Sequence, residues 1–193
     1  MIVLMSAFLL LSAFSCGGGN KANSTSEQSE ETAVNVPQFD ADSAYLYVKN
    51  QVDFGPRVPN TKEHVACGNY LAGQLEAFGA QVTNQYADLI AYDGTLLKAR
   101  NIIGSYKPES KKRIALFAHW DTRPWADNDP DEKNHNTPIL GANDGASGVG
   151  ALLEIARLVN QQQPELGIDI ILLDAEDYGA PQFYTGKHKE EFW

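Results

Sequence analysis

The sequence predicts an α/β fold in which a largely parallel sheet carries helices on both faces. Two short apolar runs, RIALFA at 113–118 and IDIILL at 168–173, have the composition of strands that are buried on both sides. Between them, residues 148–159 repeat apolar side chains at the spacing of one helical face. A strand, a helix and a second strand in this order form a right-handed crossover, which places the two strands parallel in one sheet.

The crossover helix carries its apolar residues at intervals of three and four. The residues predicted to face the core are Val149, Leu152, Leu153, Ala156 and Val159. We expect this face to pack on the sheet formed by the two apolar runs.

A helix at 60–78 precedes the sheet and has both of its ends marked. Asn60 and Glu63 form a capping-box pattern at its start, and Gly79 is the residue expected after its end. The residues expected to face inward are Val65, Leu71, Leu75 and Phe78. Cys67 lies in this helix, where a small buried thiol is the expected role.

The chain between this helix and the first apolar run predicts a hairpin. Residues 81–91 and 95–106 have the composition of strands, and Asp93-Gly94 between them is a turn signal. A further helix is expected at about 41–52, before a turn-rich stretch at 54–59.

The composition is that of an acidic globular domain. The chain has 193 residues, of which 43% are hydrophobic and 10% aromatic, which suffices for a buried core. Its 15 Lys and Arg against 25 Asp and Glu give a formal net charge of −10. Because nucleic-acid binding depends on clustered cationic side chains, this charge argues against a nucleic-acid partner.

The first 38 residues predict export and a membrane anchor. Residues 1–14 are apolar but too short to span a membrane comfortably, and AFSC at 13–16 resembles a lipobox in which Cys16 is lipidated. Residues 17–38 are rich in Gly, Ser, Asn and Glu, as a flexible tether is. We therefore expect a lipoprotein signal peptide at 1–16, a tether at 17–38 and one domain at 39–193, held at a membrane in the periplasm or on the cell surface. An ordinary secretory signal or a buried helix is the alternative for residues 1–14.

One histidine and several acidic residues follow the predicted strands. His119 and Asp121 come after the first apolar run, Asp144 stands just before the crossover helix, and the run DAED at 174–177 follows the second. In open α/β sheets, reactive groups gather beyond the carboxyl ends of the strands. An imidazole and several carboxylates at that edge can bind a divalent cation, and zinc accepts both kinds of ligand.

Each of these residues also has a simpler explanation when it is taken alone. Asp144 would cap the crossover helix, Glu176 and Asp177 would be a solvated strand end, and His119 would be a hydrogen-bonded histidine at a strand terminus. The ordered set of three strand-end clusters is what favours a site.

Two further features have more than one interpretation. The acidic stretch 127–132 resembles a calcium loop, but it lacks the turn glycine and the terminal glutamate and contains Pro130, so a solvated acidic loop is expected. Trp120 and Trp125 either form an apolar wall beside the site or are packing residues.

The ordered motifs resemble the zinc-dependent aminopeptidase superfamily, which includes glutaminyl cyclases. They are AHWDTRP at 118–124, GANDGASG at 141–148 and LLDAEDYG at 172–179, and FGPRVPNT at 54–61 resembles the opening of that domain. The first and third look most like bacterial glutaminyl cyclases of the lipoprotein type. The resemblance implies a three-layer α/β/α sandwich with a mostly parallel mixed sheet.

The resemblance also implies roles for individual residues. Asp144 and Asp177 would be zinc ligands and Glu176 the general acid/base. His119, oriented by Asp121, would be a ligand only where a second metal binds. The family places a further zinc-ligating histidine on a later strand, so the resemblance implies that the domain is incomplete at the C-terminus and that the chain is the N-terminal part of a longer protein.

Three functions follow from this resemblance. The favoured one is a zinc-dependent acyltransferase, a glutaminyl-peptide cyclotransferase that converts the N-terminal glutamine of peptides or proteins into pyroglutamate and releases ammonia. A zinc aminopeptidase is the alternative, with two zinc ions expected instead of the one expected for a cyclase. A non-catalytic surface lipoprotein that keeps the fold as a binding module is the third.

Overall fold

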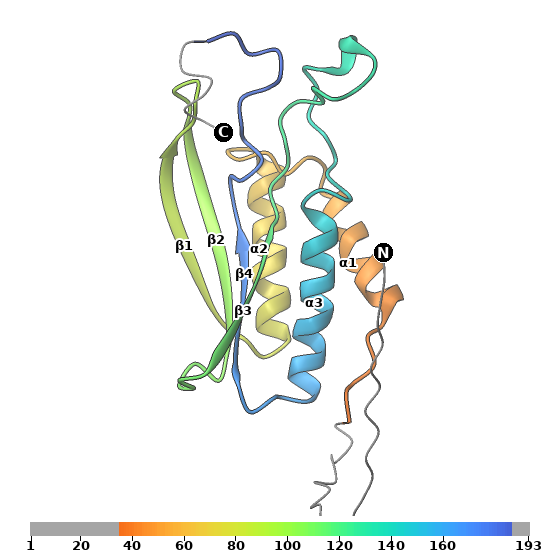
Figure 1. The fold of residues 1–193 in the computed structure, drawn as a ribbon, viewed down its shortest axis with the longest axis vertical. Coiled ribbons are helices and arrows are strands. Elements are labelled where there is room, and N and C mark those ends of the chain that lie inside the picture. Colours follow the sequence, from red (N-terminus) through yellow and green to blue (C-terminus); the bar gives the residue numbers. More distant parts are fainter. Residues whose placement is uncertain (1–34, 187–193) are drawn as a thin grey trace, which may run out of the picture. The chain divides into compact units, whose positions relative to one another are not determined.

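The computed structural model describes residues 35–186, which form a mixed α/β fold (Figure 1). The helices are α1 Ala41–Val52, α2 Lys62–Ala77 and α3 Ala146–Gln161, with a short 3-10 helix η1 at Glu132–Asn134, and the strands are β1 Gln81–Ile90, β2 Leu96–Tyr106, β3 Arg113–His119 and β4 Gly167–Leu173. The predicted helices, the hairpin and the strand-helix-strand unit are all present. The α/β class is confirmed.

The four strands form one open sheet in the order β1-β2-β4-β3. β3 and β4 are parallel, as the crossover predicted, whereas β1 with β2 and β2 with β4 are antiparallel. α2 and α3 pack on one face of this sheet and α1 lies on α3 (Figure 1). Within residues 35–186 the sheet is therefore mixed, and its helices cover one face.

The core lies between α2, α3 and the centre of the sheet. Leu71 and Leu75 of α2, Leu153 of α3, and Ile170 and Leu172 of β4 are all fully buried. The five residues predicted for the inner face of α3 are all buried. Cys67 is a buried free thiol, and burial raises its pKa to about 12, which fits the predicted packing role.

The start of α2 differs from the prediction by one residue. Thr61 is the N-cap, and its hydroxyl accepts a hydrogen bond from the backbone N–H of His64. Asn60 instead binds the hairpin: its side chain accepts from Lys98 N at 2.8 Å and donates to Leu96 O at 2.9 Å. Val65, predicted to face inward, is 56% exposed because the inner face of α2 begins at His64 and continues through Cys67.

The prediction that residues 113–118 form a strand buried on both faces is wrong for the described part of the chain. β3 is at the edge of the sheet and pairs there with β4 alone. Ile114 and Phe117 are consequently 44% and 59% exposed. β4 has a neighbour on each side but alternates between buried and partly exposed residues, because the described helices cover only one face of the sheet. The predicted burial on both faces is therefore not found in β4 either.

The predicted signal peptide, which includes Cys16, lies outside the described residues, as does most of the predicted tether. Among the residues that are described, no helix has the length and apolar character needed to cross a membrane.

Candidate active site

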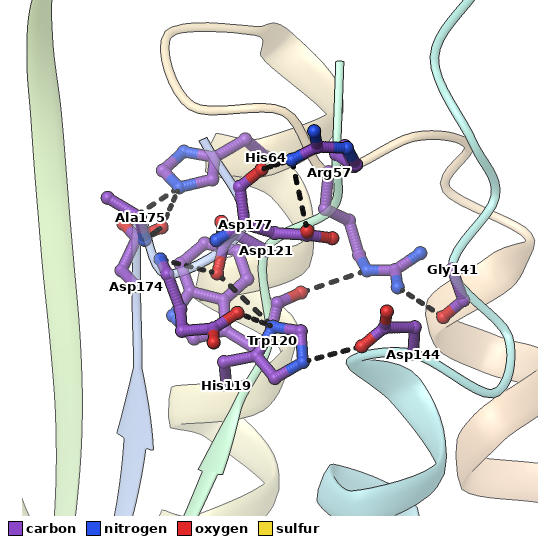
Figure 2. A network of polar contacts seen from close by, with 12 residues as sticks. Arg57, His64, His119, Trp120, Asp121, Gly141, Asp144, Asp174, Ala175 and Asp177 are labelled. Carbon is purple, nitrogen blue, oxygen red and sulfur yellow. Dashed lines mark hydrogen bonds and ion pairs between the residues drawn. The ribbon is translucent and has the colours of Figure 1, made fainter. Parts of the chain in front are cut away.

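The candidate site lies where β3, β4 and α3 meet (Figure 2). Because β3 and β4 are parallel, their carboxyl ends lie at the same edge of the sheet. His119 is the last residue of β3, Asp144 stands two residues before α3, and Asp177 follows β4. The topology thus brings together three residues that are up to 58 positions apart in the sequence.

These three side chains form a group suited to a metal ion. His119, Asp144 and Asp177 each offer one ligand atom, and these atoms lie within 4.8 Å of one another. His119 Nε2 is 3.0 Å from Asp144 Oδ1. Asp177 Oδ2 is buried and has no hydrogen-bond partner among residues 35–186. One imidazole nitrogen and two carboxylate oxygens are donors that zinc accepts, so these residues fit the predicted metal.

The carboxylates around His119 raise its pKa to about 9. The largest cause is Asp121, whose Oδ1 lies 3.5 Å from Nδ1, and Glu176 and Asp144 add to it while burial opposes it. At 3.5 Å this contact is an ion pair and not a close hydrogen bond, so Nδ1 is buried without a hydrogen bond to the described part of the chain. Without a metal, His119 is therefore protonated at neutral pH.

Asp177 is surrounded by too little positive charge, whereas His119 is surrounded by an excess of negative charge. Burial, together with the negative charges of Asp144 and Asp121, raises the pKa of Asp177 to about 6 against the opposing effects of His119 and Arg123. A carboxylate that is costly to ionise in this environment becomes favourable beside a cation.

Glu176 and Asp144 are the two solvent-accessible residues of the group. The Glu176 side chain is 62% exposed, and its Oε2 lies 3.7 Å from His119 Nδ1. It is next to Asp177 in sequence but faces solvent, so it can approach a bound substrate. This placement suits the role of proton carrier that the resemblance implied, which stays a prediction.

Asp121 holds the backbone of Glu176 and Asp177 in place. Its carboxylate is fully buried and accepts the backbone N–H groups of Glu176 at 3.3 Å and Asp177 at 3.0 Å. It thereby joins the end of β3 to the segment after β4. The family resemblance implied that Asp121 orients His119, which stays a prediction, and its hydrogen bonds also hold the backbone of Glu176 and Asp177.

Asp174 does not belong to the group of candidate ligands, although it is in the same acidic run. Its buried carboxylate faces His64 of α2, whose Nε2 lies 2.9 and 2.8 Å from its two oxygens. Sequence reasoning gave His64 no role, because nothing in the sequence links two residues that are 110 positions apart.

Arg57 is a second residue that sequence reasoning missed. Its guanidinium is fully buried and donates to four backbone carbonyls, those of Gly55 at 3.4 Å, Trp120 at 3.1 Å, Leu140 at 2.8 Å and Gly141 at 2.8 Å. Figure 2 shows the bonds to Trp120 and Gly141. Arg57 therefore fixes the loop before Asp144 to the end of β3. An arginine in the GPRVP turn, inside the segment that carried the family resemblance, was the only available signal.

The two tryptophans have different roles. Trp120 is fully buried and stacks on the ring of His64, with a centroid distance of 4.3 Å, so it is a packing residue. Trp125 is partly exposed and contacts the rings of Tyr92 and Tyr178. These contacts join the loop after β3 to the hairpin and to the segment after β4.

The prediction that 127–132 is a solvated acidic loop is wrong at its first residue. Asp127 is only 5% exposed. Both of its oxygens accept hydrogen bonds from Arg123, and Oδ2 also accepts the backbone N–H of Gln182. The Arg123 guanidinium holds the pKa of this carboxyl at about 2. Asp127 is thus a structural link between two loops beside the site.

The family model for peptidase family M28 matches residues 101–191. Those residues include His119, Asp144, Glu176 and Asp177. The resemblance to the zinc-dependent aminopeptidase superfamily is confirmed.

Solved structures with high identity agree with this family. A structure described as the glutaminyl cyclase of Bacteroides thetaiotaomicron is 95% identical with a TM-score of 0.80, over 82% of this chain and 55% of that one. A structure described as a leucine aminopeptidase precursor from the same organism gives the same values. A Zn-dependent exopeptidase from Parabacteroides distasonis is 63% identical with a TM-score of 0.79, over 81% and 54%. The chain thus spans about half the length of each.

Proposed function

We propose that the protein is a zinc-dependent glutaminyl-peptide cyclotransferase, which converts an N-terminal glutamine into pyroglutamate and releases ammonia. The observation that carries this proposal is the 95% identity, over 82% of this chain, to a structure described as a glutaminyl cyclase. Its substrates would be the N-termini of peptides or proteins that begin with glutamine.

Cyclisation suits a site with few catalytic groups. The α-amino nitrogen attacks the side-chain amide carbon of the same residue, so the substrate itself supplies the proximity of the reacting atoms. A new C–N bond forms, the bond from that carbon to the amide nitrogen breaks, and ammonia leaves. When bound, zinc supplies polarisation of the amide carbonyl.

Glu176 would carry the proton that this reaction must move. It would take a proton from the attacking amine and give it to the departing amide nitrogen, so that no net proton is gained or lost. The exposure of its carboxylate, 62%, supports this role. Asp144 and Asp177 would hold a single zinc ion, and Asp121 would hold the backbone of Glu176 in position.

The experiment that tests this proposal is a comparison of two reactions by the complete, zinc-loaded protein. Ammonia and pyroglutamyl product are measured from a glutamine-initiated peptide, and amino-acid release from aminoacyl substrates. We expect ammonia release, with a loss of about 10²-fold or more in Glu176→Gln. Glu165→Gln is the matched control, because Glu165 is exposed and precedes β4 at the opposite end of that strand from the site.

An aminopeptidase is the second candidate. It is favoured by the presence of His119 beside Asp144 and Asp177, which gives three donors for a pair of ions, and by the match to a peptidase family. Amino-acid release with two zinc ions per chain would replace the first proposal. A folded, zinc-loaded protein that is silent in both reactions would support the binding module.

We also propose that the protein is exported and anchored by a lipid on Cys16. The support is the sequence pattern of residues 1–38. In cells that express the full sequence, the protein is expected in the membrane fraction, and Cys16→Ala is expected to release it. An unchanged distribution of the variant would contradict the lipid anchor.

A further inference from the structure

The turn that carries Glu176 contains a residue in an unfavourable backbone conformation. Ala175 has φ +60°, in the left-handed region that residues with a Cβ seldom occupy. It lies directly between Asp174 and Glu176. The direction in which Glu176 leaves the end of β4 therefore depends on whatever holds Ala175 in this conformation.

The Asp174 carboxylate holds this turn at Ala175, whereas Asp121 accepts the backbone N–H groups of Glu176 and Asp177 that follow. Asp174 Oδ1 accepts the backbone N–H of Ala175 at 2.7 Å, and Asp174 Oδ2 accepts the backbone N–H of Arg100 in β2 at 2.6 Å. The backbone N–H of Asp174 itself donates to the Asn101 side chain at 2.9 Å. These bonds join the turn to the neighbouring strand β2.

His64 is the side chain that completes the environment of this carboxylate. Asp174 and His64 have side chains that are 0% and 4% exposed, and Nε2 of His64 approaches both carboxylate oxygens. The proton on Nε2 is required, because a carboxylate can only accept. Without it, a buried carboxylate would rely on two backbone N–H groups alone.

The His64 ring is itself held in place. It stacks on Trp120 at 4.3 Å with an interplanar angle of 19°, and Trp120 Nε1 donates to Arg100 O at 3.2 Å. α2 thus reaches the active-site turn through one histidine whose position is fixed by packing and by a hydrogen bond.

We propose that His64 is a positioning residue for Glu176: by donating to Asp174 it keeps Ala175 in its left-handed conformation and so keeps the Glu176 carboxylate in place. His64 touches no candidate zinc ligand and acts through the turn. This inference rests on the proposed function for its kinetic consequence, and its structural consequence can be tested separately.

The kinetic test compares His64→Leu, which removes the donor and keeps an apolar side chain, with His64→Gln, whose amide retains a donor near the position of Nε2. In the complete, zinc-loaded protein we expect kcat for cyclisation to fall about 10²-fold in His64→Leu with KM changed less than about threefold, because the misplaced group acts in the chemical step. His64→Gln should restore most of the loss. Zinc affinity should change less than about threefold in both.

Replacement of Ala175 gives the decisive second variant. Glycine adopts the left-handed conformation without the penalty of a Cβ. If His64 acts through this turn, Ala175→Gly in the His64→Leu background should raise kcat about fivefold or more. A purely structural role of His64 predicts that this second substitution leaves kcat unchanged.

Tyr106→Phe is the matched control for a lost buried hydrogen bond. Tyr106 is 2% exposed, donates to Ala156 O and pairs with the start of β4, at the far end of the sheet from Glu176. It should lower the melting temperature without changing kcat. A His64→Leu variant that keeps the wild-type kcat while folded would overturn the proposal.

Crystal structures separate this proposal from the proposed function. If neither the wild-type protein nor Glu176→Gln releases ammonia, the cyclase proposal fails, and the conformation of residue 175 in His64→Leu then decides the positioning role. A negative φ at Ala175 with a displaced Glu176 supports it. A φ that remains near +60° with Glu176 in place overturns it.

Discussion

The buried carboxylate of Asp121 offers the sharpest test of how the site is organised, through the substitution Asp121→Asn. This change keeps the size of the side chain and replaces one acceptor oxygen by an NH2 group. In the structure both oxygens accept backbone N–H groups, from Glu176 and Asp177. In the variant one of these N–H groups must therefore face another donor in a position that has no exposed surface.

Two effects of different size follow from the substitution. A buried N–H that loses its acceptor costs about 1–3 kcal/mol, so we expect the free energy of unfolding of the metal-free protein to fall by about 2 kcal/mol. The pKa of His119 should also fall from about 9 towards its ordinary value, because Asp121 is the largest cause of its rise.

The lower pKa of His119 makes the loss of stability depend on pH. A histidine whose pKa is raised by folding stabilises the protein fully below the unfolded value of about 6.5, and this contribution is lost as pH rises through about 9. Asp121→Asn removes part of it. The difference in unfolding free energy between wild type and variant should therefore be larger at pH 6 than at pH 9.

Urea unfolding of the zinc-free protein at these two pH values measures the stabilities, and NMR titration of the His119 ring measures its pKa. Asp88→Asn is the control, because Asp88 forms an exposed ion pair with Lys98 and should contribute less than about 1 kcal/mol. A variant with equal losses at pH 6 and pH 9 and an unchanged His119 pKa would refute the role assigned to Asp121.

Three further predictions concern the metal and the loops that frame it. Calorimetric zinc titrations should show that an ion held by Asp144 and Asp177 changes affinity less than about threefold between pH 7 and 9, because Asp177 with a pKa of about 6 is already ionised there. An ion that binds through His119 should instead gain about tenfold per pH unit over that range, because the ring must lose its proton first. Arg57→Met should lower the free energy of unfolding by about 2–3 kcal/mol in chemical denaturation, because four backbone carbonyls lose a donor and the bonds to Trp120 O and Gly141 O are buried. Gly141→Ala should lower zinc affinity, measured by chelator competition, because Gly141 has φ +55° and a Cβ there would lie 2.6 Å from Asp144 O.

The elements of this fold were predictable because each leaves a local signal. The inner face of α3 follows from spacing alone, and Asp93-Gly94 marks the hairpin. The approach of His119 to Asp177 was also predictable, since parallel pairing of β3 and β4 places the residues after both strands at one edge. Local pattern and one topological rule sufficed for these features.

The errors share a physical cause, which is that the burial of a residue depends on its partners in the folded structure and not on the composition of its own segment. RIALFA has the composition of an inner strand, but its exposure depends on which strands flank it. Asp127 stands in an acidic run, but it is buried because Arg123 and the backbone of Gln182 neutralise and bind it. Composition describes a residue's own preference and contains no record of such partners.

Hydrogen bonds to the buried carboxylates explain how several acidic residues can lie close together in this site. Asp121 and Asp174 are fully buried, and each accepts two backbone N–H groups besides a contact with a histidine. Asp177 has no such compensation: Arg123 lies 4.0 Å from Oδ1, and Oδ2 has no hydrogen-bond partner in residues 35–186. The uncompensated negative charge thus lies on Asp177, which the family resemblance implied to be a zinc ligand. A cation at this position would relieve the cost that raises the pKa of Asp177, whereas at Asp121 or Asp174 it would compete with bonds that already exist.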